Sequence, residues 1–359
     1  MRILYAETSA YAPSSAHFLE AFEAMAARGA LKFAFLDEAK YLRARPSIAY
    51  RIARRVTGRP PGYRALNVAL VAGARRLRPD LVLVGKGAWY SPAALREVRE
   101  STGAVMVNWA TDDPFNPANG SHDLAESIRL YDLYVCTRRA AMADVERAGC
   151  RNVAYVRFGY KPEVHFPQSP ATAEEERRFG CDVVFIGGCD RDRAPYFEAL
   201  VRALPEIRLN LFGGYWGEVP ALARYWRGVA VGRDFRLAIG GAKIAINLVR
   251  RANRDDHVMR TFEVPACGGF MLTERTPAHE EIFGEDREAA FFSSPGEMAA
   301  KVRDWLARDE ARRAVAAAGH RKVTTSHNTY ADRLAEILDL SRPLMKERAA
   351  LGPTAHAVL

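Results

Sequence analysis

One stretch of the chain, Arg260–Leu272, carries a carboxylate, a glycine pair and an apolar run in close succession. Glu263 lies near the start of an expected helix, and Arg260 precedes it by one helical turn, so both side chains can reach the same ligand. Gly268 and Gly269 have no Cβ atom, which lets the backbone approach a bound molecule closely. We expect Glu263 to accept hydrogen bonds from the hydroxyl groups of a ribose.

A second stretch joins an apolar run to Gly187 and Gly188, and then to two arginines, Arg191 and Arg193. Backbone N–H groups in a glycine-containing turn between strand and helix can face a phosphate. Arg193 or Arg191 would add charge-assisted hydrogen bonds to a diphosphate. The competing interpretation is a tight turn that binds no ligand.

Charges of both signs crowd the segment from Arg250 to Glu263, which contains Asp255. A polar loop that directly follows an apolar strand is expected where a charged ligand binds at the end of a sheet. The alternative is a surface loop whose salt bridges contribute little. We favour a ligand-binding role for Asp255, because the loop, the glycines and the expected end of the sheet coincide.

Two neighbouring carboxylates in the first half, Asp112 and Asp113, follow another apolar run, Ala104–Asn108. Either carboxylate can act as the general base that removes a proton from a hydroxyl group. Pro114 restricts Asp113 to extended backbone conformations. The competing interpretation is an Asx-type turn. Lys86 and Trp89, which follow the apolar run Leu81–Val84, can also line the cleft, and His17 and His122 are weaker candidates.

Short apolar runs alternate with amphipathic stretches along the whole chain, which indicates βαβ units and parallel sheets. The alternation pauses at Tyr160–Gly180, a stretch with three prolines and a run of charged residues, and then restarts. We therefore predict an α/β protein with two Rossmann-like, doubly wound lobes. A cleft between the lobes, where the strands end, is the expected binding site.

This pause sets the predicted domain boundaries. They are an N-terminal Rossmann-like domain at 1–160, a linker at 161–180, a C-terminal Rossmann-like domain at 181–327, a helix at 328–345 that can cross to the first lobe, and a flexible tail at 346–359. Basic amphipathic helices are expected at Tyr41–Arg55 and Tyr63–Leu77, on either side of a Pro-Pro-Gly break.

Length and composition limit the expected number of domains and the expected cellular compartment. With 359 residues, of which 49% are hydrophobic, the chain can form two domains of ordinary size. No apolar run approaches the ~18 residues that span a bilayer, and the first residues read as a strand and not as a signal peptide. The five cysteines are scattered without CxxC pairs, which argues against a zinc site and favours the cytoplasm.

The net charge of +9 is unevenly distributed, because Lys40–Arg78 contains eleven basic residues and no acidic one. Such a block favours an anionic partner, such as a phosphorylated acceptor or membrane headgroups, and a peripheral location at the inner membrane surface. Nucleic acid is disfavoured because few aromatic residues are interleaved. A solvated, arginine-rich surface is the alternative.

In these residues the chain resembles the GT-B glycosyltransferases, specifically the CgeB-like (spore maturation protein) group with its C-terminal glycosyl-transferase domain. The resemblance covers most of the C-terminal half and rests on the order and spacing of short motifs: Phe185–Gly188, Leu211–Trp216, Arg260–Gly269, Phe291 with Glu297, Ala318–Val323, His327–Tyr330 and Arg333. In the N-terminal half it is looser and rests on Trp109–Pro114.

The resemblance implies a nucleotide-sugar donor bound mostly by the C-terminal domain, an acceptor-side N-terminal domain, and neither a cofactor nor a metal ion. Retaining enzymes of this fold often carry Glu-x7-Glu, and Glu263 matches the second, ribose-binding position. Asp255 stands at the first position, a departure that leaves the stereochemical outcome open. Asp190 and Asp192 match a metal-binding pattern by letter, but we interpret them as part of a turn.

The predicted activity is transfer of a sugar from a nucleoside diphosphate sugar to a hydroxyl acceptor, which can be a glycan, a lipid-linked molecule or a small molecule. Asp112 or Asp113 would take the acceptor proton if the reaction inverts. The alternatives are a nucleotide-sugar epimerase or hydrolase on the same fold, and a non-enzymatic two-lobed ligand-binding protein. A Rossmann dehydrogenase is disfavoured, because the first expected turn, Ala6–Ala10, contains no glycine.

Overall fold

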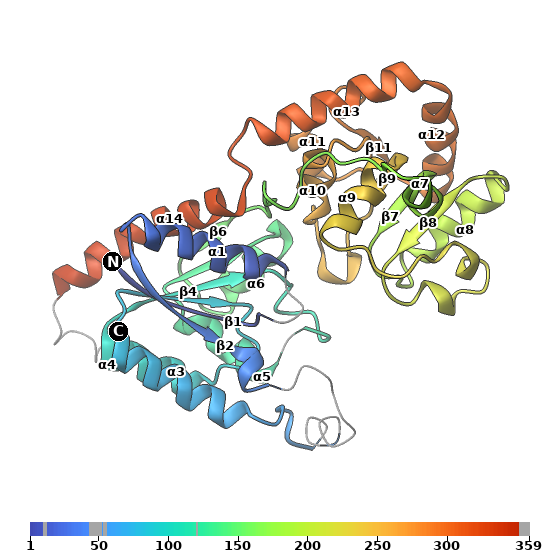
Figure 1. Ribbon diagram of the computed structural model, residues 1–359. Helices are drawn as coiled ribbons and strands as arrows, with labels where there is room; N and C mark the ends of the chain where they lie inside the picture. Colours follow the sequence, from blue (N-terminus) through green and yellow to red (C-terminus); the bar gives the residue numbers. More distant parts are fainter. Residues whose placement is uncertain (10–12, 43–51, 53–55, 120, 352–359) are drawn as a thin grey trace. The chain divides into compact units, whose positions relative to one another are not determined.

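The computed structural model describes residues 1–9, 13–42, 52, 56–119 and 121–351. The chain folds into two compact units, which are connected more than once (Figure 1). The first unit comprises Met1–Arg157, Ala252–Arg254 and Tyr330–Leu359, and the second comprises Phe158–Arg251 and Asp255–Thr329.

Six parallel strands form the sheet of the first unit, in the order β2-β1-β3-β4-β5-β6. They are β1 (Arg2–Glu7), β2 (Lys32–Asp37), β3 (Leu81–Gly85), β4 (Val105–Ala110), β5 (Leu133–Cys136) and β6 (Val153–Tyr155). The order reverses between β1 and β3, because β2 lies outside β1 and the later strands lie on the other side. In open parallel sheets, ligands bind at the carboxyl ends of the strands near such a reversal.

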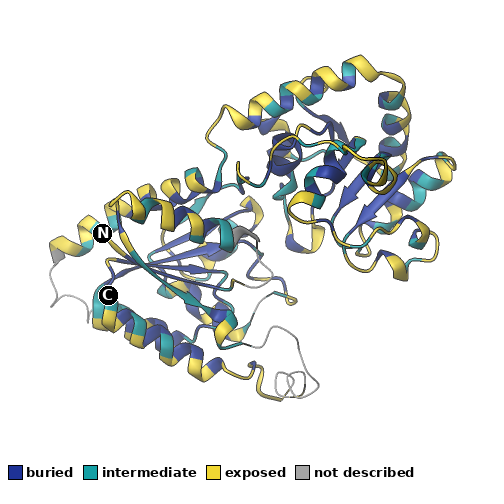
Figure 2. Ribbon diagram, viewed as in Figure 1, coloured by how far each residue is buried: buried dark blue, intermediate teal, exposed yellow. Residues whose placement is uncertain are grey.

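Helices cover both faces of this sheet (Figure 2). They are α1 (Pro13–Ala27), α3 (Tyr63–Leu77), α4 (Pro92–Thr102), α5 (His122–Ser127), α6 (Met142–Arg147) and α14 (Tyr330–Leu351), with the single turns η1 (Glu38–Lys40), η2 (Ile128–Leu130) and η3 (Arg139–Ala141). Leu4 and Val82 pack with α3, α4 and α6, whereas their neighbours Ile3 and Leu81 pack with α1 and α14. Side chains of a strand alternate between faces, so both faces of this sheet are apolar.

The second unit contains five parallel strands in the order β11-β10-β9-β7-β8. They are β7 (Cys181–Ile186), β8 (Leu209–Phe212), β9 (Ala242–Asn247), β10 (Met271–Glu274) and β11 (Ala290–Phe292). Val183 and Phe185 pack with α8 and α12, and Val184 and Ile186 pack with α9 and α10 on the opposite face.

The helices of the second unit are α7 (Ala173–Phe179), α8 (Ala194–Ala203), α9 (Arg233–Gly240), α10 (Arg260–Ala266), α11 (Pro277–Ile282), α12 (Pro295–Ala307) and α13 (Asp309–Thr324), with the single turns η4 (Trp216–Glu218) and η5 (Ala223–Tyr225). A further turn, η6 (Arg251–Asn253), leads into the three-residue segment that belongs to the first unit. Helix α12 begins as its capping box predicts, because the Ser294 hydroxyl accepts a hydrogen bond from Glu297 N at 3.2 Å.

The prediction of two doubly wound α/β lobes is confirmed, since each parallel sheet carries helices on both faces. The predicted helix Tyr63–Leu77 coincides with α3. The other predicted basic helix, Tyr41–Arg55, falls mostly outside the described residues, and so do residues 352–359 of the predicted tail.

Residues 161–180, predicted as a linker, belong to the second unit and contain α7, which the sequence interpretation missed. Thr172 accepts a hydrogen bond from Glu175 N at 3.2 Å, and the Glu175 carboxylate accepts one from Ala171 N at 2.8 Å. This is a capping-box arrangement, so a sequence signal was present in the charged run.

Candidate functional site

Helix α10 places Arg260 at the carboxyl edge of the second sheet. Its Nε donates to the carbonyl of Ile186, the last residue of β7, at 3.2 Å, and its guanidinium lies 4.7 Å from the centre of the Phe235 ring. Arg260 also pairs with Glu263, one turn further along the helix. The two residues share one face as predicted, but the Glu263 side chain is only 1% exposed.

A histidine holds the other oxygen of this carboxylate. His165 Nε2 lies 3.5 Å from Glu263 Oε1, and His165 Nδ1 accepts a hydrogen bond from Lys161 N at 3.1 Å. Because Nδ1 is an acceptor, neutral His165 carries its proton on Nε2, which faces Glu263. Burial lowers the pKa of His165, although Glu263 opposes the shift. Sequence reasoning missed His165 because it lies in the stretch interpreted as a linker.

Arg193 secures the turn after β7. Its guanidinium donates to the carbonyls of Gly188 at 3.0 Å and Leu248 at 3.4 Å, which ties the ends of β7 and β9 together. Asp190 Oδ1 accepts from the backbone N–H groups of Asp192 at 3.0 Å and Arg193 at 2.9 Å. The interpretation of this Asp-x-Asp segment as a turn is therefore confirmed.

The turn after β7, which contains Gly187 and Gly188, packs closely against the turn after β8, which contains Gly213 and Gly214. This packing explains part of the need for glycine. A Cβ atom on Gly213, which has φ +126°, would lie 2.3 Å from the carbonyl oxygen of Gly187. The Gly187 carbonyl also accepts from Trp216 Nε1 at 2.8 Å, and Cys189 N donates to Gly214 O at 2.9 Å. At Gly188, by contrast, the nearest atom to an added Cβ lies at 3.8 Å.

Gly268 and Gly269 lie elsewhere, at the amino end of β10. Gly268 has φ +76° and closes α10 by donating to Pro265 O at 2.8 Å. A Cβ atom on Gly269 would lie 2.5 Å from Ile239 of α9. In a parallel sheet this edge is opposite the one where Gly187 and Arg260 lie. The structure therefore does not bring the glycine pair together with the other predicted residues.

Asp255 lies within electrostatic range of Arg193. Burial lowers the pKa of Arg193, and Arg250 and Arg260 lower it further, whereas Asp190 and Asp255 raise it. This edge of the sheet thus gathers Arg193, Arg250 and Arg260 with three carboxylates, those of Asp190, Asp255 and Glu263. Arginine side chains are suited to bind a ligand such as a diphosphate.

A buried polar network fixes the start of α10 behind these charges. His279 lies between Thr261 Oγ1 at 2.9 Å and Thr273 Oγ1 at 3.2 Å, and Asn247 Nδ2 donates to both hydroxyls, at 3.2 and 3.1 Å. Burial lowers the pKa of His279 to about 4, so the ring is neutral at physiological pH. Sequence reasoning missed this set, although Asn247 and Thr273 are buried polar residues at or near the carboxyl ends of β9 and β10.

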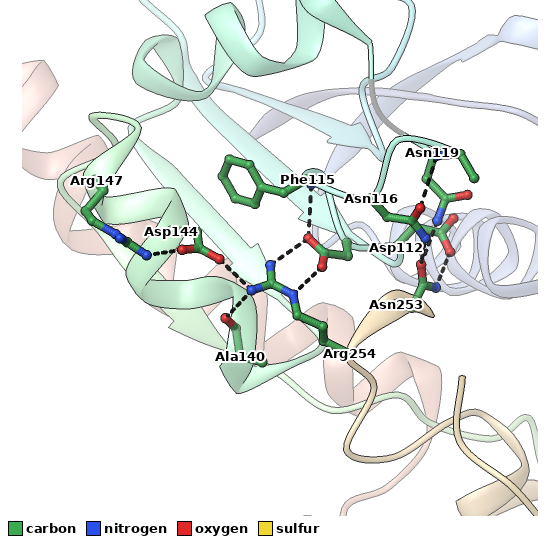
Figure 3. A network of polar contacts seen from close by, with 11 residues as sticks. Asp112, Phe115, Asn116, Asn119, Ala140, Asp144, Arg147, Asn253 and Arg254 are labelled. Atoms are coloured by element: carbon green, nitrogen blue, oxygen red, sulfur yellow. Dashed lines mark hydrogen bonds and ion pairs between the residues drawn. The ribbon is translucent and has the colours of Figure 1, made fainter. Parts of the chain in front are cut away.

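In the first unit, Asp112 follows β4 and is ionised. Its Oδ2 lies 2.9 Å from Lys86 Nζ. Its Oδ1 accepts a hydrogen bond from Asn253 Nδ2 at 2.9 Å, which Figure 3 shows. Burial by itself would raise the pKa of Asp112, but Lys86 and Asn253 outweigh it and hold the pKa below its usual value. The side chain is 22% exposed.

Asp113 has a different environment. Its two oxygens pair with Arg254 Nε at 2.6 Å and Arg254 Nη2 at 3.0 Å, and Oδ1 also accepts from Phe115 N at 3.0 Å, as in an Asx turn. Arg254 Nη1 continues to Asp144 Oδ2 at 2.6 Å. Asn253 and Arg254 come from the loop predicted to bind the ligand of the second domain, but they belong to the first unit.

Charged residues follow four neighbouring strands of the first sheet: Glu38 after β2, Glu7 at the end of β1, Lys86 after β3 and Asp112 after β4. Burial raises the pKa of Glu7 to about 8 and that of Glu38 to about 7, while Lys86 opposes both shifts. The sequence interpretation assigned no functional role to Glu7 or Glu38.

The remaining candidates, His17, His122 and Trp89, make contacts within the first unit. The His17 ring lies 5.0 Å from the Tyr330 ring, His122 lies 3.5 Å from Glu126 on the surface, and the Trp89 carbonyl accepts from Asn67. In the described part of the basic block, Arg59 pairs with Asp123 at 3.0 Å and Arg75 with Glu97 at 2.7 Å. Acidic residues from other segments thus neutralise part of this charge.

Residues 191–339 match the protein family described as glycosyl transferase-like. No curated protein matches the chain. No helix in the described part of the chain is both long and apolar enough to span a membrane.

Several solved structures share the fold at low sequence identity. HepE of Anabaena, solved in complex with UDP-glucose, superposes with a TM-score of 0.67 at 12% identity, over 96% of this chain and 100% of HepE. Sucrose-phosphate synthase of Thermosynechococcus elongatus gives 0.66 at 13% identity, over 97% and 100%. The N-terminal domain of Candida albicans trehalose-6-phosphate phosphatase gives 0.59 at 13% identity, over 95% and 97%. The shared fold is GT-B, and at these identities the likeness concerns the fold alone.

Proposed function

We propose, from the glycosyl transferase-like domain and the GT-B fold of this chain, that it transfers a sugar from a nucleoside diphosphate sugar to an acceptor hydroxyl. The observation that carries the proposal is the Arg260–Glu263 pair at the carboxyl edge of the second sheet. Arg260 lies within electrostatic range of Arg193, and the pair falls within the family-matched residues. HepE, a protein of the same fold, binds UDP-glucose.

In this proposal the second unit binds the donor. Arg260, whose side chain is 29% exposed, and Arg250 contact the diphosphate. The Gly187–Gly188 turn offers the Gly188 N–H, because the N–H groups of Gly187 and Cys189 already donate to Phe212 O and Gly214 O. Arg193 keeps that turn in shape through its two carbonyl contacts. Glu263 is the proposed ribose-binding residue; since its side chain is 1% exposed and its two oxygens face Arg260 and His165, the proposal requires these contacts to rearrange when the donor binds. The same cations stabilise the diphosphate as it leaves.

Asp112 is the proposed general base for an inverting reaction, and it is preferred over Asp113 because its side chain is the more exposed, 22% against 3%. Asp113 is bound on both oxygens by Arg254 and acts as a positioning residue. We further propose action in the cytoplasm without metal ion or cofactor, and membership of the CgeB-like group from the order of its motifs.

A thermal-shift panel of uridine, guanosine and thymidine diphosphates and their sugars tests the donor site. A ligand at about 100 times its Kd stabilises the native protein by about 2.7 kcal/mol, which raises the unfolding temperature by several degrees. At least one member of the panel should do so. If none stabilises the protein, the donor site is wrong.

The position of that site is tested by Arg260→Gln, with Arg208→Gln as the matched control. Arg208 is exposed and lies before β8, at the amino edge of the sheet, 3.5 Å from Asp182. We expect Arg260→Gln to weaken nucleotide binding about tenfold or more, since a charge-assisted contact contributes about 1.5–3 kcal/mol. Arg208→Gln should leave the Kd unchanged. Equal affinities of the two variants in a titration would remove Arg260 from the site.

A further inference from the structure

The first unit contains a cavity of about 600 Å³, and of the residues that line it only Asp113 has a predicted role. It lies between the loop after β4, helix α6 and the segment Ala252–Arg254. This volume is within the range of roughly 300–1,000 Å³ that is usual for small-molecule sites. All residues that line the cavity belong to the first unit, whereas the proposed donor residues belong to the second.

Four of the residues that line the cavity are apolar, namely Phe115, Pro117, Ala148 and Ala252, and Phe115 is 38% exposed. Figure 3 shows the Phe115 ring beside the Arg254 and Asp144 side chains, without an interaction drawn from the ring itself. An aromatic face left partly open in a cavity offers a flat apolar surface to a ligand.

The charged residues that line the cavity are two arginines and two aspartates, whose charges balance. Arg254 pairs with Asp113 at 2.6 Å and with Asp144 at 2.6 Å, and Arg147 pairs with the other oxygen of Asp144. Hydrogen bonding to Arg254 lowers the pKa of Asp144. Two arginines thus face two ionised aspartates, and the site has no net charge to attract an anion.

Some of these charged side chains remain accessible to solvent. The exposed fractions of the Arg147, Arg254 and Asp144 side chains are 77%, 39% and 22%. Guanidinium groups have five N–H donors, and an ionised carboxylate accepts up to four hydrogen bonds, so paired groups keep capacity for a ligand. Fixed donors and acceptors opposite an apolar ring suit a molecule with an apolar face and a hydroxyl-bearing edge.

We propose that this cavity is the acceptor site and that it binds an uncharged sugar ring, stacked on Phe115 and hydrogen-bonded to Arg147 and Asp144. The inference rests on the proposed glycosyl transfer and specifies its acceptor class. It favours a neutral glycan over the anionic acceptor that the basic block suggests, because both arginines of the cavity are already paired. Asp113 and Arg254 are positioning residues that hold the polar wall in place.

Saturation-transfer NMR with two probe sets, methyl glycosides of common hexoses and the corresponding hexose phosphates, tests this site. We expect saturation transfer to at least one methyl glycoside. Phe115→Ala should weaken it about tenfold, as should Ala148→Trp, which fills the cavity without touching a charge. Leu340→Ala is the matched control, because Leu340 is 40% exposed in the same unit and does not line the cavity.

The outcomes separate this inference from the proposed function, which the nucleotide panel tests. Nucleotide binding without binding of any methyl glycoside, or glycoside binding unchanged in both cavity variants, overturns the acceptor site and leaves the donor site standing. Stronger, Arg147-dependent binding of hexose phosphates overturns the neutral acceptor class. Glycoside binding lost in both variants, in a protein that binds no nucleotide, supports the sugar site and refutes the transferase.

Discussion

Gly213 and Gly214 are adjacent after β8, but their environments differ sharply. Gly213 has φ +126°, and an added Cβ would lie 2.3 Å from Gly187 O and 3.0 Å from Gly188 N. At Gly214 no atom lies within 4 Å of an added Cβ. The two turns at the carboxyl ends of β7 and β8 therefore approach each other so closely that one specific position has room for no side chain.

Replacing Gly213 by alanine should destabilise the second unit by roughly 2–4 kcal/mol, because the backbone conformation is strained for an L-residue and the turns must separate. Gly214→Ala should change the free energy of unfolding by less than about 1 kcal/mol. Urea unfolding of the two variants measures the difference. Equal unfolding midpoints would show that the close approach of the turns does not constrain Gly213.

At the scale of elements, the carboxyl ends of parallel strands concentrate ionisable groups in both sheets. In the first sheet, Glu7 is buried beside Gly85, where a Cβ atom would lie 1.6 Å from the Glu7 carboxylate. Burial raises the pKa of Glu7 from 4.5 to about 8. The folded protein therefore keeps a proton that the unfolded chain loses above pH 4.5.

The raised pKa of Glu7 determines how the stability of the folded protein changes with pH. A carboxyl group whose pKa is raised in the folded state contributes stability that is complete below pH 4.5 and is lost as the pH rises to about 8. The Glu7→Gln side chain cannot ionise. Between pH 5 and 9 the free energy of unfolding of this variant should therefore fall by roughly 3 kcal/mol less than that of the parent protein. Urea unfolding across this range measures the effect. The exposed control Glu100→Gln should follow the parent, and parallel curves for all three proteins would contradict the prediction.

For the molecule as a whole, the first unit is completed by segments that follow the second unit in the sequence. The chain leaves the second unit twice, at Ala252–Arg254 and again at Tyr330. Helix α14 then completes the core of the first unit, where Ile337 is fully buried and Leu340 remains 40% exposed. Residues at the far end of the sequence thus stabilise the fold that the first residues begin.

Ile337→Ala should therefore weaken the first unit by about 2–4 kcal/mol, the usual cost of truncating a buried aliphatic side chain. Leu340→Ala should cost less than about 1 kcal/mol. Hydrogen–deuterium exchange locates the effect: β3 should exchange faster in Ile337→Ala, and β7 should be unaffected. Faster exchange in β7 alone would contradict the assignment of α14 to the first unit.

The sequence by itself determined the fold class, most strands and helices, and the Arg260–Glu263 pair. Apolar periodicity, glycine breaks and capping boxes are local signals, and each element can be recognised from a few neighbouring residues. The two residues of the pair also meet for a local reason, since one helical turn separates them. The same locality explains the turn assigned to Asp190–Arg193.

Only the tertiary structure decided which partner each charge takes and which glycines matter. Asp113 pairs with Arg254, 141 residues away, and Glu263 faces His165 from a supposed linker. It also placed Gly268 and Gly269 at the edge of the sheet opposite Arg260. Such contacts depend on strand order and on which strand ends meet, and that order arises from long-range packing that residue spacing along the chain does not encode.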